Sequence, residues 1–133
     1  MPILATGTVE TVFTPLSADQ AEGSILTRVS VDKRFRGSLE ASSSGEMLSA
    51  VTGVAGSSAF VALERVSGAL HGRSGSFVLQ HSGLLRHGST DYSIAVVPDS
   101  GTGELAGLSG RMQVHQVDGR HSYDFEYSLE PLK

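Results

Sequence analysis

The chain has no cysteine and little charge, and it lacks long apolar runs. The absence of Cys from its 133 residues excludes a disulfide scaffold, a thiolate metal site and a cysteine nucleophile. Charged residues make up 18% of the chain, below the roughly 25% of average globular proteins. Hydrophobic residues make up 39%, and none of their runs approaches the length of a transmembrane helix. The composition is therefore that of neither a disordered nor a membrane-spanning chain.

The charge balance is weakly acidic. Ten Lys and Arg residues against 14 Asp and Glu give a net charge of −4, so the chain is a poor binder of phosphate backbones and we expect no nucleic-acid partner. The N-terminal stretch has neither the basic region nor the apolar run of a signal peptide, and no lipidation signal is visible. We therefore expect a cytoplasmic protein with no membrane partner.

Glycine and serine are abundant instead, with 16 and 20 residues. Apolar and polar residues alternate with the period of two that is typical of half-buried strands. The last segment shows this most clearly, because aromatic residues alternate there with Ser, Asp and Glu. The alternation predicts eight strands, at residues 6–14, 25–39, 46–54, 59–70, 76–81, 92–97, 108–117 and 121–129.

Short connections between these strands predict antiparallel neighbours. Asp118-Gly119 fits a two-residue hairpin turn between the last two strands, and residues 15–23 are expected to hold one short helical turn capped by Ser17. Eight such strands curl readily, and closure removes exposed edges. We predict an all-β fold, with residues 1–133 forming a single domain. It is a closed, mainly antiparallel barrel of about eight strands with at most one short helical turn. An antiparallel sandwich is the alternative that alternation alone does not exclude.

A glycine-rich motif follows the strand at 92–97. Its spacing, G-x-G-x-x-x-G-x-x-G, and the aromatic strand further on resemble the barrels of allene oxide cyclases and dirigent proteins. Over most of residues 6–130 the chain more closely resembles a family of small bacterial proteins of unknown function with an allene-oxide-cyclase-like barrel. The phrases that carry this resemblance are residues 45–47, 63–66, 72–77, 79–81 and 101–105. The resemblance implies the fold but no activity, because that family has none assigned and the cyclase's cysteine has no counterpart here.

Familiar ligand motifs are missing. The Gly101-Thr102-Gly103 loop precedes a strand, whereas a nucleotide-binding loop needs a helix N-terminus after its glycines. No G-x-S-x-G elbow occurs. The five histidines form neither an H-x-H pair nor an H-E-x-x-H motif, and we expect most of them at the surface. We therefore predict no metal site and no cofactor.

One pair of ionisable residues is predicted to face the barrel interior. If its strand turns Phe60 inward, Glu64 faces inward as well, and the same alternation turns His81 inward on the next strand. Such a couple could exchange protons with a bound small molecule. Two alternatives stay open: a structural pair that closes a barrel end, or a slip in the alternation that leaves Glu64 at the surface and turns Arg65 inward.

The tyrosines are candidate hydrogen-bond donors. Tyr92, Tyr123 and Tyr127 share the inward parity of their strands, and the alternative is that they are core residues with satisfied hydroxyls. We choose Tyr92 as the donor near the couple. The predicted catalytic residues are thus Glu64, His81 and Tyr92.

Two functions fit this pattern. The first is binding of a small apolar ligand in the barrel, extending to a cofactor-independent isomerase or cyclase. The second is a non-catalytic structural or assembly barrel with a filled core. A cavity of roughly 300 Å³ or more at Glu64 or His81 favours the first, while the many large residues of inward parity favour filling.

The alternation also predicts the core and the outer face. On the outside, Val61, Leu63 and Val78 could form an apolar patch through which a homodimer or homotrimer assembles, as the resemblance to related barrels implies. The residues predicted to be buried inside are Val29, Val31, Phe35, Phe60, Phe77, Leu79, Ile94, Val96, Met112, Val114, Phe125 and Tyr127.

Overall fold

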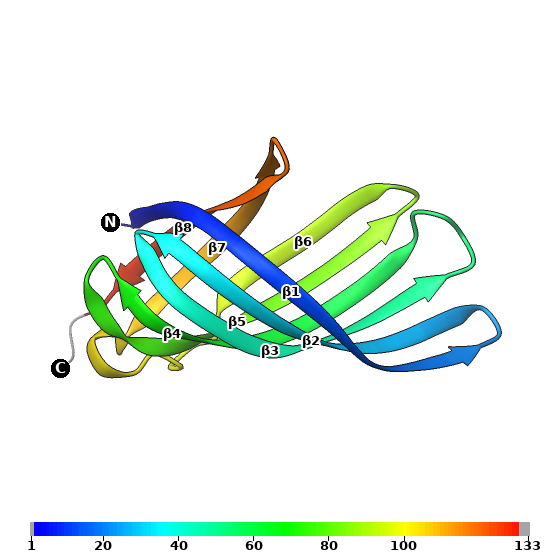
Figure 1. The fold of residues 1–133 in the computed structure, drawn as a ribbon, viewed down its shortest axis with the longest axis horizontal. Helices are drawn as coiled ribbons and strands as arrows, with labels where there is room; N and C mark the ends of the chain where they lie inside the picture. The colour runs from blue at the N-terminus through cyan, green and yellow to red at the C-terminus, as the bar shows by residue number, and fades with distance from the viewer. Residues whose placement is uncertain (1, 131–133) are drawn as a thin grey trace.

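A computed structural model describes residues 2–130 as a closed barrel in which each strand pairs with the next and β8 pairs with β1 (Figure 1). The pairings are antiparallel throughout. The predicted all-β closed barrel is confirmed, and the sandwich is excluded. The elements are β1 (Ile3–Ala21), β2 (Ser24–Gly37), β3 (Leu39–Thr52), β4 (Ser58–Leu70), β5 (Arg73–Arg86), β6 (Ser89–Val96), the 3-10 turn η1 (Gly103–Leu105), β7 (Leu108–Val117) and β8 (Arg120–Leu129).

Two-residue turns close four of the hairpins, and three of these turns have both residues in the left-handed conformation. Asp118 and Gly119 have φ of 51° and 78°, the left-handed pair that matches the twist of the flanking strands, so the predicted turn is confirmed. His71-Gly72 and His87-Gly88 repeat this conformation between β4 and β5 and between β5 and β6. Two of the five histidines therefore lie in turns at the barrel ends.

The predicted helical turn at residues 15–23 is wrong. β1 continues to Ala21 and pairs with β2 up to Ala21↔Ser24, so cross-strand pairing satisfies the backbone that a helical turn would have used. Pro15 is accommodated by a register shift between Pro15 and Ser17. It lies beyond Val9, the last β1 residue paired with β8, where β1 is an edge strand that can hold a proline. Among residues 2–130 the one helical turn is η1.

Another correction concerns the start of β3. This strand begins at Leu39 rather than at residue 46, and it includes the serine run at residues 42–44, which lies outside the predicted strands. Its inward positions are Leu39, Ala41 and Ser43, all buried, so the alternation continues through small residues. The preceding strand ends at Gly37, whose φ of 108° reverses the chain.

The loop before β7 covers one end of the barrel. Leu105 of η1 is 1% exposed and packs into this end. The Thr102 N–H donates to the Ser76 carbonyl (2.8 Å), and the Ser76 N–H donates to Thr102 Oγ1 (3.0 Å), which fastens the loop to β5. The glycine motif therefore builds a plug, and a strand follows it as expected. No helix among residues 2–130 is long and apolar enough to cross a membrane.

Behind this plug, aromatic side chains fill the barrel. The Phe35 and Tyr123 rings meet edge to face with centroids 5.7 Å apart, and Phe77 stacks on Phe125 at 5.8 Å. The Tyr123 hydroxyl accepts the Leu39 N–H (2.9 Å) and lies within donating distance of the Arg36 and Leu39 carbonyls. This half of the barrel, which also holds the first residues of β1 and the end of β8, is called the filled half below.

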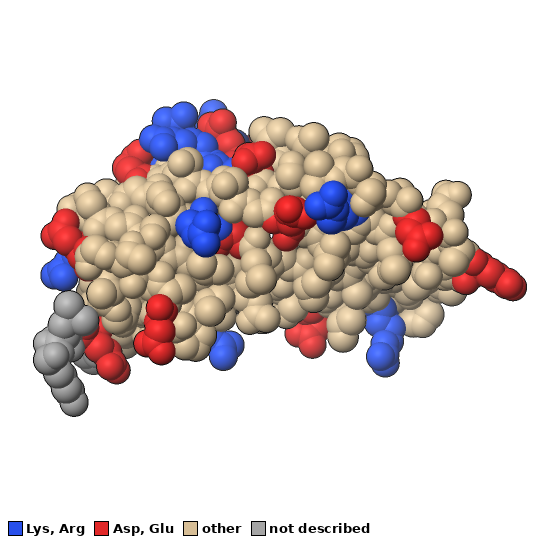
Figure 2. Space-filling view, turned by 90° about the horizontal axis from the view of Figure 1, so that it is seen from below, with Lys and Arg blue, Asp and Glu red and all other residues tan. Residues whose placement is uncertain are grey.

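The predicted core is buried with three exceptions. Val29, Phe60 and Val114 are only partly buried, because they lie toward the other end of the barrel, called the open half below. On the outer face Val61 and Leu63 are exposed as predicted, whereas Val78 is partly buried. The face in Figure 2 shows basic side chains gathered at the upper left with acidic ones beside them, and elsewhere single charged residues among uncharged ones. The oligomeric state stays a prediction.

Candidate functional site

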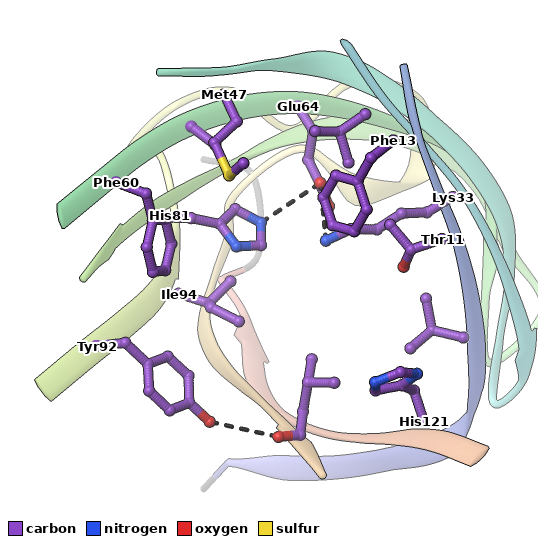
Figure 3. A pocket seen from close by; sticks show the side chains of 14 residues that line it. Thr11, Phe13, Lys33, Met47, Phe60, Glu64, His81, Tyr92, Ile94 and His121 are labelled. Atoms are coloured by element: carbon purple, nitrogen blue, oxygen red, sulfur yellow. Dashed lines mark hydrogen bonds and ion pairs between the residues drawn. The ribbon is translucent and has the colours of Figure 1, made fainter. Parts of the chain in front are cut away.

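The open half encloses a cavity of about 360 Å³ with mostly apolar walls (Figure 3). Every strand contributes to it, because inward side chains of all eight strands converge there. The lining residues are Val9, Thr11, Phe13, Val31, Lys33, Met47, Phe60, Ala62, Glu64, His81, Tyr92, Ile94, Val114 and His121.

Glu64 and His81 are brought together in this cavity, as the alternation predicted. The side chain of Glu64 on β4 is 3% exposed, so the alternative that left it at the surface is wrong. It pairs with Leu79 of β5, and His81 two residues further on faces the same side. The His81 Nε2 atom lies 3.4 Å from Glu64 Oε2. Arg65 is exposed on the outside, and the ion-pair partners of Glu64 among the described residues are Lys33 and His81 instead.

Lys33 is a third member that the sequence argument did not name. Its Nζ lies 3.0 Å from Glu64 Oε2, and its side chain is 11% exposed (Figure 3). Lys33 is on β2, two strands away from Glu64, and Gly45 of β3 pairs with Glu64 between them. A Cβ at Gly45 would stand 2.6 Å from the Glu64 Cα, so this glycine leaves room for the two charged side chains to meet.

The electrostatics favour an ionised carboxylate. Burial alone would raise the pKa of Glu64, but the side-chain contact with His81 and the charge of Lys33 together outweigh burial and hold that pKa below its ordinary value of 4.5. The Oε2 atom receives both contacts. The buried Oε1 atom has no hydrogen-bond partner among residues 2–130. The cluster of Lys33, Glu64 and His81 thus lies on the wall of an apolar cavity, and one of its acceptors is buried without a partner among these residues.

Tyr92 lines the cavity but lies apart from this cluster. Its side chain is at the rim, 41% exposed, and its hydroxyl donates to the Val114 carbonyl at 3.4 Å. β6 and β7 are paired only at Ala95↔Arg111, so this hydroxyl spans the place where the two strands separate. Within the described structure no hydrogen bond joins Tyr92 to Glu64 or His81, and Figure 3 shows it across the cavity from Glu64.

The other predicted donors belong to the filled half. The Tyr127 hydroxyl is hydrogen-bonded to His71 Nδ1 (2.5 Å), and Tyr123 is satisfied by the backbone around Leu39. Burial raises the pKa of both phenols above the ordinary value of 10.0. They are core residues with satisfied hydroxyls, which was the alternative interpretation.

The remaining histidines form no metal centre. His115 pairs with Asp124 on the exposed surface at 2.9 Å, and His121 lies on the cavity wall away from His81 (Figure 3). In residues 2–130 no group of three or more His, Asp or Glu side chains is arranged to hold a metal ion. The ionisable chemistry of the cavity therefore centres on Lys33, Glu64 and His81.

Fold and site together define a class: a small antiparallel β-barrel with one filled half and one open half that ends on a buried ionisable cluster. Residues 5–127 match the family described as "Protein of unknown function (DUF3224)", and the chain belongs to this family. It is similar to the crystal structure of a DUF3224 protein with unknown function from Shewanella oneidensis MR-1. The two chains are 46% identical, with a TM-score of 0.95 over 99% of this chain and 100% of that one. No curated protein matches the chain.

These comparisons bear on the resemblance seen in the sequence. The resemblance to a bacterial family of unknown function is confirmed. Neither match names a relation to allene oxide cyclases, so that likeness stays an expectation.

Proposed function

We propose that the protein binds a small, mainly apolar molecule in the open half of the barrel and holds its polar group against Glu64 and His81. The observation that carries the proposal is the apolar cavity of about 360 Å³ that ends on these two residues. This volume is within the range of small-molecule sites, roughly 300–1,000 Å³. It also exceeds the limit of roughly 300 Å³ that separated a binding barrel from a filled one in the sequence argument.

Proton transfer to and from the ligand is the chemistry that the cluster supports. A carboxylate that is ionised and lies on the cavity wall can accept a proton from a bound molecule, and the imidazole of His81 beside it can return one. A ligand held in fixed contact with such a couple can isomerise or cyclise without a cofactor. The activity we propose is therefore that of a cofactor-independent isomerase or cyclase.

The alternative, a structural barrel, draws its support from the filled half. There, aromatic packing leaves Phe35, Phe77 and Phe125 at 0–1% exposure, as expected for a structural barrel with a filled core. The open half does not follow this pattern, since Phe60 and Val114 remain partly exposed around the cavity.

Dye binding tests the proposal directly. Nile red, an uncharged apolar dye, should bind with enhanced fluorescence and be displaced by apolar compounds of suitable size. Ala62→Phe adds a ring inside the cavity and should weaken binding about tenfold or more, the cost of roughly 1.4 kcal/mol of lost contact. Val61→Phe adds the same ring on the exposed outer face and should leave binding unchanged. Equal effects of the two variants, or none from Ala62→Phe, would place the dye elsewhere and overturn the proposal.

The proton-transfer part needs a separate comparison. Glu64→Gln keeps the shape of the side chain and removes its charge, so it should abolish turnover of any converted ligand while dye binding persists. Glu46→Gln changes an exposed carboxylate on the neighbouring strand and serves as the control. Unchanged turnover in Glu64→Gln would overturn the proposed proton transfer by Glu64 and leave only the binding function.

A further inference from the structure

Lysine is rare in this chain, and its position is unusual. The sequence contains two lysines, Lys33 and Lys133, against eight arginines. Lys133 lies outside the described residues, so Lys33 carries the only side-chain primary amine of residues 2–130. That single amine lies inside the barrel, on the wall of the apolar cavity.

The surface ion pairs of the same strand show the contrast. Arg28, Arg34 and Arg36 of β2 form exposed pairs with carboxylates, at 2.9, 3.5 and 3.7 Å. The inward position alone carries lysine. A guanidinium cannot lose its proton in a protein, whereas a lysine amine can, and only the free amine is a nucleophile. A purely structural counter-ion to Glu64 would not require this choice.

We infer that Lys33 captures an aldehyde or ketone group of the ligand as a Schiff base, with Glu64 as the counter-ion of the resulting iminium. The inference rests on the proposed function, since the carbonyl compound has to occupy the same cavity. The geometry that carries it is the Nζ–Oε2 distance of 3.0 Å in an enclosure with mostly apolar walls.

The step balances with the groups present. The Lys33 ammonium gives a proton to the Glu64–His81 couple, and the free amine adds to the carbonyl carbon to form a carbinolamine. The added nitrogen loses a second proton to the couple, and the couple returns both protons to the carbinolamine oxygen, which leaves as water while the C=N bond forms. The sum is R–NH₃⁺ plus a carbonyl giving an iminium ion plus water, with no oxidant or reductant.

The same charges argue against a carboxylate ligand. The positive Lys33 is already neutralised by Glu64 at Oε2, so an incoming carboxylate would add a second negative charge beside Glu64. A neutral carbonyl brings no charge into the cavity. The ligand class is therefore an apolar aldehyde or ketone.

Reductive trapping tests the inference on the unmodified protein. Incubation with cinnamaldehyde and sodium cyanoborohydride should add the mass of the aldehyde less one oxygen to Lys33, located by peptide mapping. Because the cavity holds the carbonyl beside the amine, Lys33 should react about tenfold or more faster than the internal reference Lys133. Labelling of Lys33 no faster than Lys133 would overturn the inference.

Two variants and a second ligand complete the test. Lys33→Arg keeps the positive charge and should lose the adduct, and Arg34→Lys places an exposed amine on the same strand that should react no faster than Lys133. Cinnamyl alcohol has the same carbon skeleton but no carbonyl, and it should displace Nile red from the unmodified protein. If the alcohol displaces the dye but Lys33 is not trapped, the Schiff base is overturned and the binding function stands. If neither compound displaces the dye, the proposed function fails as well.

Discussion

The filled and open halves of this barrel are built from the same strands with the same alternation, yet their interior side chains are packed to different degrees. In the filled half Phe35, Tyr123 and Phe125 are completely buried; Phe35 packs against Tyr123, and Phe125 stacks on Phe77. In the open half Phe13 and Tyr92, also on lining strands, are 57% and 41% exposed. The difference teaches that alternation decides which side of a strand faces inward, but not whether the space inside is filled.

Strand pairing explains where the change occurs. β1 pairs with β8 only from Ile3 to Val9 and then continues alone with β2. β6 and β7 are paired at a single position, Ala95↔Arg111. The wall is thus continuous around the filled half and parted at two seams around the open half, which leaves the interior side chains there without opposite partners.

Removing one aromatic ring from each half should give the largest difference in stability between the two halves. Phe125→Ala in the filled half should lower the free energy of unfolding by about 3–5 kcal/mol, because the side chain is completely buried. Phe60→Ala at the cavity should cost clearly less, since this ring is already partly exposed. Urea unfolding of both variants measures the difference. Equal losses would show that the two halves are packed alike.

Glycines offer a second contrast. A Cβ at Gly7 would stand 1.8 Å from the Arg36 carbonyl oxygen, a backbone atom that cannot step aside, so Gly7→Ala should cost about 1–3 kcal/mol or more. A Cβ at Gly83 would meet the Phe60 ring at 2.4 Å, and that ring borders an open cavity into which it can turn. Gly83→Ala should therefore cost less in thermal or urea unfolding and instead change dye affinity. A reversed order of stabilities would contradict this account.

Removing single hydroxyls should give a smaller difference. Tyr123→Phe leaves the buried Leu39 N–H without its acceptor and should cost about 1–3 kcal/mol. Tyr92→Phe removes a long hydrogen bond at the exposed rim, and its effect should be within about 0.5 kcal/mol. The two variants are compared by urea unfolding under identical conditions. A loss in Tyr92→Phe as large as that in Tyr123→Phe would mean that the seam between β6 and β7 is a main support of the barrel.

The smallest expected effect is the acid response of the cluster. Because the pKa of Glu64 is lower in the folded protein than its ordinary 4.5, this carboxylate stabilises the fold above pH 4.5, and the contribution is lost as the pH falls through the folded pKa. The groups that face it are Lys33 from β2 and His81 from β5. Urea midpoints of Glu64→Gln should accordingly fall less on acidification below pH 4.5 than those of the unmodified protein or of the surface control Glu46→Gln. Parallel pH curves for all three would contradict the lowered pKa.

Much of the fold could be predicted because each strand carries its own alternation. The strand ends at residues 15–21 and 42–44 could not be predicted, because they have few apolar side chains and the alternation is lost there. They are strands because each pairs with a long neighbouring strand. The proximity of Glu64 and His81 could be predicted from the sequence, since the two-residue turn at His71-Gly72 fixes the register between β4 and β5.

Lys33 shows what the sequence could not supply. Its parity was visible, because it stands between the inward residues Val31 and Phe35. Its contact with Glu64 spans two strand interfaces and depends on the missing side chain of Gly45 between them. Such a contact requires the registers of β2, β3 and β4 together, which no local pattern contains.

The proline in β1 protects the protein against aggregation through an unpaired strand edge. Beyond Val9 the outer edge of β1 lacks a partner within the barrel, and a bare strand edge is a template for aggregation. Pro15 has no N–H to offer and the register shift beside it bends the edge, while Asp19 and Glu22 add repelling charges near the hairpin tip. The open half can therefore admit a small molecule while the free edge of β1 resists pairing with a strand of another chain.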